Sequence, residues 1–343
     1  MLLVMCDVYY IKKFSLLKEE NDKIKGMKEY TVNQKESGQT LEKYIKKVLN
    51  TAPLSFIYKL FRKKDIKVDG HWQKEKYIIS AGEEISIYLS DDQLEDFKKQ
   101  KVVEQANNIS TWIIYEDANI ILINKPRGVL VQKADKGDYA LDDMVLSYLK
   151  EKGEYEESDV FSPAPVHRLD RNTAGIIIFA KNLRTAQYLN NVINDKNVIL
   201  KEYLALVRGH ISSEGIVDAP LLKKVSHVEV DCDLGKEAVT KYNLVKYVGD
   251  YSLVNIALLT GRTHQIRVHM SYINHPLIGD KKYGDYVLNK KIEEKYHFKN
   301  QFLVAYKLSF YNIEGELSYL ANKTFEVELP PDCKELISIF EHK

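Results

Sequence analysis

Hydrophobic and polar positions in the first quarter of the chain follow the period of two short helices. In QTLEKYIKKVLN (39–50), apolar side chains recur on one helical face and lysines on the opposite face. After Pro53, LSFIYKLFRKK repeats this arrangement. The runs IKVDGHWQ and EKYIISAGEEISIYL then predict short strands, with tight turns at Asp69-Gly70 and Ala81-Gly82. The pattern predicts a small unit of two helices and several strands over residues 27–90.

Farther along, strand-like runs outnumber helical ones. WIIYEDANIILINK (112–125) contains two apolar runs and is followed by the turn Lys-Pro-Arg-Gly. Helical spacing occurs at 139–150 and 182–194, and strands are predicted at 176–180, 201–208, 239–248 and 251–258. Because helices do not alternate regularly with strands, an α+β domain over 112–343 is favoured over a doubly wound sheet.

Two further stretches fit neither pattern. Residues 1–26 extend no periodic segment, so we expect an N-terminal extension of unclear role, or translation that begins at Met27. The polar stretch 91–111 is typical of a linker. The predicted order is therefore an extension (1–26), a small domain (27–90), a linker (91–111) and a large domain (112–343).

Composition narrows the class of protein. At 343 residues and 45% hydrophobic, the chain can bury more than one core. Its longest apolar runs are far shorter than the roughly 20 residues of a membrane span, and its N-terminus lacks the features of a signal peptide. We therefore expect a soluble, cytoplasmic protein without a membrane partner. The three cysteines form neither a disulfide framework nor a CxxC metal half-site.

Positive and negative charges nearly balance over the whole chain, but they are unevenly distributed along the sequence. The net charge is +1, whereas residues 27–80 contain twelve Lys and Arg against six Asp and Glu. Six of these cations lie opposite the apolar stripes of the two predicted helices. Such a face is either an ordinary solvated surface or a surface for an anionic partner.

One aspartate stands in a conspicuous charged cluster. In HRLDRNTAGIIIFAK (167–181), Asp170 is suited to be an ion-pair partner, a metal ligand or a reagent. A carboxylate attacks only when it is ionised, and a neighbouring arginine favours that form. Four arginines are available, and their spacing in the sequence does not choose between them: Arg168, Arg171, Arg262 and Arg267.

The sequence lacks the residue patterns that several other common enzyme chemistries require. GDKKYGD (279–285) has glycines at P-loop spacing, but Asp285 stands where a phosphate-binding lysine is required. His264 and His269 are five residues apart, which places them on opposite faces if the run is a strand, so a shared metal ion is not expected. No GxSxG, HExxH or Rossmann glycine motif is present.

Four motifs in order carry a family resemblance. HRLDRNTAGIIIFAK, KEYLALV (201–207), TGRTHQIRVHM (260–270) and HPLIGDKKYG (275–284) together resemble the RluA family of pseudouridine synthases. INKPRGVLV fits the opening motif of this family, and the resemblance spans residues 112–310. Within the family, the layout looks most like the RluC-type enzymes of large-subunit rRNA. Residues 27–90 resemble an S4 RNA-binding domain.

The resemblance implies a fold, an activity and roles for four residues. The large domain would have a mixed, largely antiparallel sheet with flanking helices, and would convert uridine to pseudouridine without a cofactor or a metal. Asp170 would be the nucleophile, Arg267 its ion-pair partner, Tyr203 the aromatic residue against the base, and Arg168 the residue that holds the rearranged RNA. Ala174 departs from the serine of many relatives, which affects one local hydrogen bond.

The basic face of residues 27–80 then becomes a candidate for contacts with RNA phosphates, contributed by Lys43, Lys46, Lys47, Lys59, Arg62 and Lys63. Ribosomal RNA is the expected substrate and a monomer the expected state. Two alternatives stay open: a tRNA-modifying enzyme of the same family, and a non-catalytic RNA-binding factor of ribosome assembly. His264 and His269 are expected to be hydrogen-bonded structural histidines.

Overall fold

The computed structural model describes residues 26–50, 52–89, 109–134, 138–156 and 159–342. These form two compact units, one of the described residues up to 89 together with 159–161, the other of the remaining described residues. Nearly all of the predicted extension and most of the predicted linker lie outside the described residues. Within the ranges above, no helix combines the length and the apolar character needed to cross a membrane.

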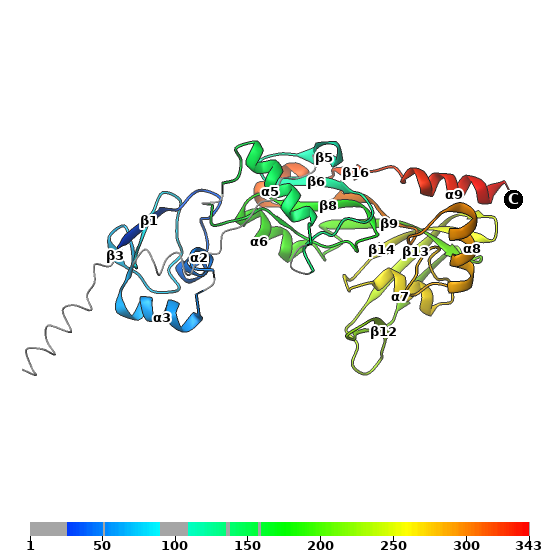
Figure 1. The fold of residues 1–343 in the computed structure, drawn as a ribbon, viewed down its shortest axis with the longest axis horizontal. Helices are drawn as coiled ribbons and strands as arrows, with labels where there is room; N and C mark the ends of the chain where they lie inside the picture. The colour runs from blue at the N-terminus through cyan, green and yellow to red at the C-terminus, as the bar shows by residue number, and fades with distance from the viewer. Residues whose placement is uncertain (1–25, 51, 90–108, 135–137, 157–158, 343) are drawn as a thin grey trace, which may run out of the picture. The chain divides into compact units, whose positions relative to one another are not determined.

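The smaller unit packs two helices against one sheet. Its four strands are antiparallel and lie in the order β1-β4-β2-β3 (Figure 1). The elements are β1 (Met27–Thr31), α2 (Leu41–Val48), α3 (Leu54–Lys63), β2 (Ile66–Val68), β3 (His71–Trp72) and β4 (Glu84–Tyr88). The predicted helices are confirmed, and all five residues of the first apolar stripe are buried: Leu41, Tyr44, Ile45, Val48 and Leu49.

The strands of this unit differ in part from the prediction. The tight turn between β2 and β3 is confirmed, with Asp69 and Gly70 both at positive φ. In EKYIISAGEEISIYL, the strand predicted after the turn Ala81-Gly82 is β4 (Glu84–Tyr88), whereas the stretch before that turn is not a strand and forms only an isolated bridge between Ile78 and Thr40. Strand β1 was missed because its five residues MKEYT carry almost no apolar signal, and it is fixed by pairing with β4.

The larger unit is built on a ten-stranded mixed sheet. Eight strands follow the order β10-β13-β14-β9-β15-β8-β6-β5, with β7 beside β8 and β16 beside β15. All these pairs are antiparallel except β15 with β8, which run parallel in the middle of the sheet. The predicted α+β class, with a largely antiparallel sheet and flanking helices, is confirmed.

Where runs were predicted, for β5, β6, β8, β9, β13, β14, α5 and α6, their bounds agree closely with the structure; the elements β10–β12, β15, β16 and α7–α9 were not predicted. The strands are β5 (Ile113–Glu116), β6 (Ile120–Lys125), β7 (Ala164–Pro165), β8 (Ala174–Ala180), β9 (Ile199–Arg208), β10 (Glu214–Asp218), β13 (Val239–Val248), β14 (Tyr251–Leu258), β15 (Leu303–Phe310) and β16 (Thr324–Glu326). A separate hairpin joins β11 (Leu221–Lys223) to β12 (Val228–Val230). The helices are η1 (Ser110–Trp112), α5 (Leu141–Glu151), α6 (Leu183–Val192), α7 (Gln265–Tyr272), α8 (Tyr286–Tyr296), η2 (Gly315–Leu320) and α9 (Pro331–Glu341).

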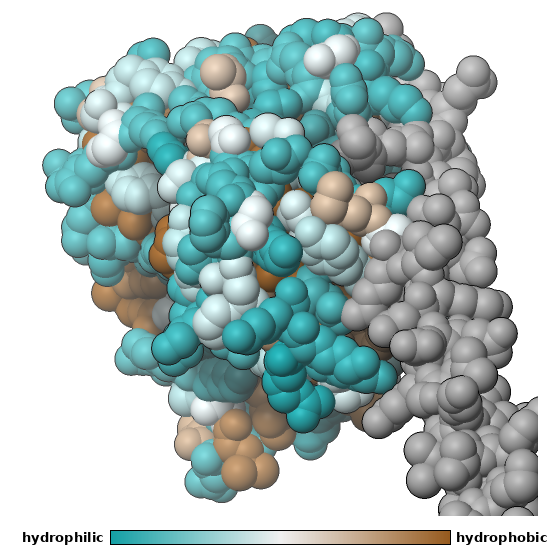
Figure 2. Space-filling view, turned by 90° about the vertical axis from the view of Figure 1, so that its left-hand side faces the viewer, coloured by the Kyte–Doolittle hydropathy of each residue, from teal (hydrophilic) through white to brown (hydrophobic). Residues whose placement is uncertain are grey.

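Both faces of the central strands are buried, which explains their unbroken apolar sequences. On β8, Ile177 and Phe179 pack in the cluster that includes α5, whereas Ile176 and Ile178 pack in the cluster that includes α6. Figure 1 shows α5 and α6 on opposite sides of β6 and β8. The face of the molecule in Figure 2 is mostly hydrophilic, with hydrophobic residues in small separate patches.

The parallel pair of β8 and β15 requires one glycine. Gly175 has φ +116°, and a Cβ built there would lie 2.1 Å from the carbonyl oxygen of Ala305 on β15. No side chain fits at that distance, and few L-residues adopt that backbone conformation. The close approach places the start of β8, and therefore the loop before it, beside β15 at the centre of the sheet, one strand away from β9.

Candidate active site

Asp170 lies in the loop that leads into β8. The backbone N–H of Thr173 donates to the carbonyl of Asp170 (3.0 Å), which closes a turn after the aspartate. Gln301 Nε2 lies 3.4 Å from Thr173 Oγ1. The side chain of Asp170 keeps 25% of its surface exposed, so the carboxylate reaches solvent from a fixed loop.

Lys125 ties this loop to the end of β6. Its side chain is fully buried, and Nζ donates to the carbonyls of Pro126, Val129 and Arg171 at 2.9, 2.9 and 3.0 Å. Burial lowers the pKa of Lys125 to about 7, an effect that the Asp170 carboxylate opposes. Three carbonyl acceptors need three N–H donors, so they favour the ammonium form. Lys125 therefore fixes the backbone directly after Asp170.

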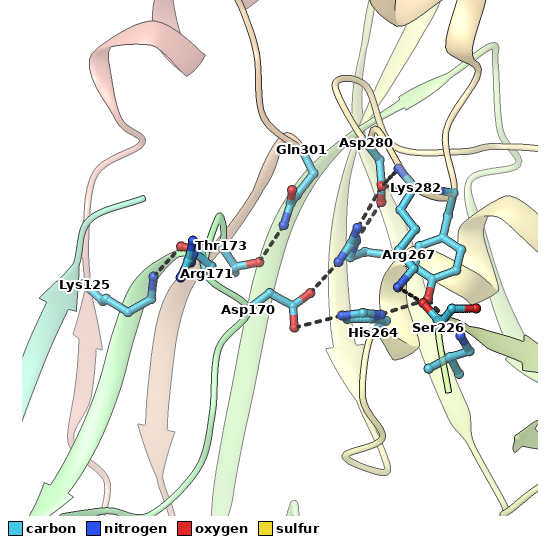
Figure 3. Close-up of polar contacts among 12 residues, drawn as sticks. Lys125, Asp170, Arg171, Thr173, Ser226, His264, Arg267, Asp280, Lys282 and Gln301 are labelled. Atoms are coloured by element: carbon cyan, nitrogen blue, oxygen red, sulfur yellow. Dashed lines mark hydrogen bonds and ion pairs between the residues drawn. The ribbon is translucent and has the colours of Figure 1, made fainter. Parts of the chain in front are cut away.

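Arg267 joins Asp170 to a second, buried carboxylate (Figure 3). Its Nη1 donates to Asp170 Oδ2 at 2.9 Å, while Nε and Nη2 donate to the two oxygens of Asp280 at 2.7 and 2.9 Å. Asp280 is 1% exposed and also accepts from the backbone N–H groups of Lys282 and Tyr283. Burial alone would raise the pKa of Asp280, but these hydrogen bonds outweigh it and lower that pKa.

The ion pair with Asp170 thus belongs to Arg267 and not to the arginines nearer in sequence. Arg267 comes from α7, 97 residues farther along the chain. Arg171 instead lies 3.7 Å from Asp138. The two carboxylates raise the pKa of Arg267 despite its burial, so it stays charged.

A cleft of about 720 Å³ opens over Asp170. This volume is in the usual range of small-molecule pockets. Asp170 is the single carboxylate among its lining residues, which include six Lys and Arg side chains: Arg168, Arg171, Lys201, Arg262, Arg267 and Lys282. Such a lining favours an anionic ligand around one carboxylate.

Two residues predicted from sequence line this cleft. Tyr203, on β9, is 5% exposed, and burial together with the negative charge of Asp170 raises the pKa of its hydroxyl. Arg168 is exposed at the rim. The structure therefore brings Asp170, Tyr203, Arg267 and Arg168 to one cleft.

The histidines have distinct environments. His167 accepts from the backbone N–H of Ile178 (3.3 Å), and burial lowers its pKa to about 3, so it stays neutral and structural. The run from Gln265 to Tyr272 is helix α7, not a strand; His269 lies within it and His264 directly before it. His269 is buried and bonded to Thr240 and Ala219, as expected for a structural histidine. His264 lies in the cleft, with Nε2 3.8 Å from Asp170 Oδ1. Within the described ranges, no cluster of His, Cys, Asp or Glu is arranged to hold a metal ion.

Several known proteins are similar to this chain in sequence. A family profile described as "RNA pseudouridylate synthase" matches residues 119–272, which include Asp170, Tyr203 and Arg267. An "Uncharacterized RNA pseudouridine synthase" of Mycoplasma capricolum is 32% identical over 87% of this chain and 96% of that protein. The chain belongs to the RNA pseudouridine synthase family. It is therefore an enzyme that isomerises uridine in RNA.

Other members of the family match this pseudouridine synthase over most of its length. "Ribosomal large subunit pseudouridine synthase D" of Buchnera aphidicola is 31% identical over 88% of this chain and 94% of that protein. "Ribosomal large subunit pseudouridine synthase C" of Haemophilus influenzae is 31% identical over 85% and 90%. The solved structure "Human RNA Pseudouridylate Synthase Domain Containing 4" covers 68% of this chain and 93% of its own, with 23% identity and a TM-score of 0.54, which supports the fold.

Three residues of the site were missed from sequence. Lys125 and Asp280 lie in motifs that carried the family resemblance, but neither had a predicted role. A lysine or aspartate in a turn is usually solvated, and only tertiary packing buries these two. His264 was predicted to be structural; it is hydrogen-bonded, and it also faces Asp170. The one sequence signal that could have identified these residues is that all three lie in the motifs that carry the family resemblance of this pseudouridine synthase.

The buried Asp280 makes the stability of the enzyme depend on pH. Because its pKa is lowered from the ordinary value of 3.8, its ion pair stabilises the fold above that pH and is lost as the pH falls below it. Asp280→Asn should be less stable at neutral pH, and its melting temperature should change less than that of the wild type between about pH 5 and pH 3. Asp250→Asn, in an exposed turn, serves as control and should keep the wild-type dependence. A wild-type dependence in Asp280→Asn would contradict the assignment.

Proposed function

We propose that this enzyme modifies uridines of large-subunit ribosomal RNA, with Asp170 as its nucleophile. The observation that carries the proposal is the Asp170 carboxylate, held by Arg267 at the floor of a cleft that is otherwise basic. The guanidinium of Arg267 donates to Asp170 Oδ2 at 2.9 Å and so orients the carboxylate toward the cleft. The relatives named for the large ribosomal subunit support ribosomal RNA as the substrate.

The reaction is an isomerisation, so the product has the same atoms as the substrate, and the enzyme has to hold the uridine firmly in position. The bond between N1 of uracil and C1′ of ribose breaks, a bond between C5 and C1′ forms, and the proton lost from C5 is balanced by one gained at N1. We propose that Tyr203 packs against the uracil ring and that Arg168 holds the displaced RNA strand. The target must leave its stack to enter the cleft, at a cost of a few kcal/mol, and the basic lining offsets part of that cost by binding phosphates.

The smaller unit is proposed to bind RNA as an S4-like domain. Four of its six candidate cations are exposed on the helices: Lys43, Lys59, Arg62 and Lys63. Lys46 instead pairs with Glu42 at 2.6 Å, and Lys47 lies over the ring of Phe161. We therefore assign phosphate contacts mainly to the four exposed cations, which supply affinity without sequence specificity. We also propose that the enzyme is a monomer and that it acts on ribosomal RNA in the cytoplasm.

Mapping of pseudouridines in cells tests the substrate. Total RNA from cells that lack the enzyme should lose pseudouridine at one or more positions of large-subunit rRNA, and the wild-type gene should restore them. Loss confined to tRNA would favour the alternative of a tRNA enzyme. Unchanged maps of both RNAs would refute ribosomal RNA as the substrate; the alternative of a non-catalytic assembly factor is disfavoured by the family and by the intact Asp170, Tyr203 and Arg267.

A further inference from the structure

His264 lies between a tyrosine and the proposed nucleophile. Its Nδ1 is 2.8 Å from Tyr283 Oη, and its Nε2 is 3.8 Å from Asp170 Oδ1. Figure 3 shows the ring of His264 facing Asp170. The residue precedes α7 with φ 55°, in the left-handed region that few residues with side chains adopt. The buried side chain of Gln265 fixes the loop before His264. Its oxygen accepts from Thr260 Oγ1 and from the backbone N–H of Arg262, and its nitrogen donates to the carbonyl of Val239 and to Thr240 Oγ1.

Hydrogen bonding selects one tautomer of this ring. Tyr283 Oη accepts the backbone N–H of Val228 at 3.0 Å, which leaves the phenol proton free to donate to Nδ1. A neutral imidazole carries one N–H, so Nε2 is then the protonated nitrogen. The opposite tautomer would turn a bare Nε2 lone pair toward the Asp170 carboxylate, and two acceptors repel. Both neighbours therefore favour an N–H directed at Asp170 Oδ1.

The charges around the ring favour this neutral form. Burial lowers the pKa of His264, and the cations Arg267 and Lys282 act in the same direction. The carboxylates of Asp170 and Asp280 oppose this effect without overcoming it. The ring of Tyr283 packs edge-on against the imidazole, with centroids 5.5 Å apart.

We propose that His264 is a positioning residue for the isomerisation, which directs its Nε2–H at Oδ1 of Asp170 while Arg267 holds Oδ2. The inference rests on the proposed role of Asp170 as nucleophile. A carboxylate held at one oxygen still rotates about its Cβ–Cγ bond, whereas contacts at both oxygens fix its plane. The distance of 3.8 Å exceeds a hydrogen bond, and contacts of this kind tighten when a substrate fills the site. Fixed orientation of a reacting group is a large source of rate.

Substitution of His264 by glutamine or by asparagine distinguishes the contributions of the two ring nitrogens. The amide nitrogen of glutamine reaches about as far as Nε2, so His264→Gln keeps a donor for Asp170. The shorter asparagine in His264→Asn reaches about as far as Nδ1, so it keeps only the contact with Tyr283. Asparagine also tolerates left-handed backbone, so strain at this position does not explain a defect in that variant.

The measurement is the single-turnover rate of pseudouridine formation at saturating enzyme, with RNA affinity and melting temperature determined for each variant. We expect His264→Gln to stay close to the wild type and His264→Asn to fall by about tenfold, the loss typical of one hydrogen bond to a charged group. RNA affinity should be unchanged in both, because the effect is on the reaction step. Equal rates for the two variants, or a slower glutamine variant, would overturn the proposal.

Asp170→Asn, measured alongside, separates this inference from the proposed function. If Asp170→Asn is inactive and His264→Asn reacts at the wild-type rate, only the role of His264 is refuted. If Asp170→Asn stays active, the proposed nucleophile is refuted and the inference about His264 falls with it.

Discussion

Asp170→Asn will abolish pseudouridine formation and leave the fold and RNA binding intact. Asparagine has nearly the same shape as aspartate, so the loop closed by Thr173 and fixed by Lys125 is retained. The amide has no negative charge and is a very poor nucleophile, so the rate should fall by at least about 10³-fold, as for other enzymes that lose their nucleophile. Release of tritium from RNA labelled at C5 of uridine measures the activity.

Asp250→Asn is the matched control for this variant. Asp250 lies in the exposed turn between β13 and β14, and its replacement should leave activity unchanged. Melting temperature and RNA affinity of Asp170→Asn should equal those of the wild type. In cells, the map of pseudouridines with Asp170→Asn should match that of cells without the enzyme. Turnover by the purified variant at the wild-type rate would show that Asp170 is not the nucleophile.

Arg267→Met will reduce both stability and activity. The substitution leaves Asp280 charged, buried and without its main partner, and removal of one member of a buried ion pair costs about 3 kcal/mol or more. It also removes the donor that holds Oδ2 of Asp170 in position, so activity should be lost even in the fraction of protein that stays folded. Chemical denaturation and single-turnover rates at a temperature where the variant is folded measure the two effects.

Two further variants separate the causes. Arg267→Met combined with Asp280→Asn removes the unpaired buried charge, so it should regain part of the stability but none of the activity. Arg208→Met breaks a pair with Asp285 of the same length, 2.9 Å, but Arg208 is 54% exposed. An exposed pair contributes about 1 kcal/mol or less, so that control should be nearly neutral. If the double variant is fully active, Arg267 has no role in catalysis.

Much of the fold was predictable because its patterns are local. The apolar runs of β6 and β8 and the one-sided stripe of α2 are set by neighbouring residues, and the bounds of β13 and β14 agree with the predicted runs to the residue. Predictions failed where pairing with a distant segment decides the structure. Strand β1 depends on β4, and the first half of EKYIISAGEEISIYL forms only an isolated bridge, between Ile78 and Thr40.

The sequence by itself determined the α+β class, the order of the motifs and the family, since these follow from periodicity and from short stretches that can be recognised one at a time. It pointed to Asp170 as the reactive residue, and through the family resemblance to Arg267 as its partner. Only the tertiary structure places Asp280 on the other side of Arg267, Lys125 under the loop and His264 at the second oxygen of Asp170. Burial and contacts between residues 13 to 97 positions apart create these relations, and neither quantity is a property of a short stretch of chain.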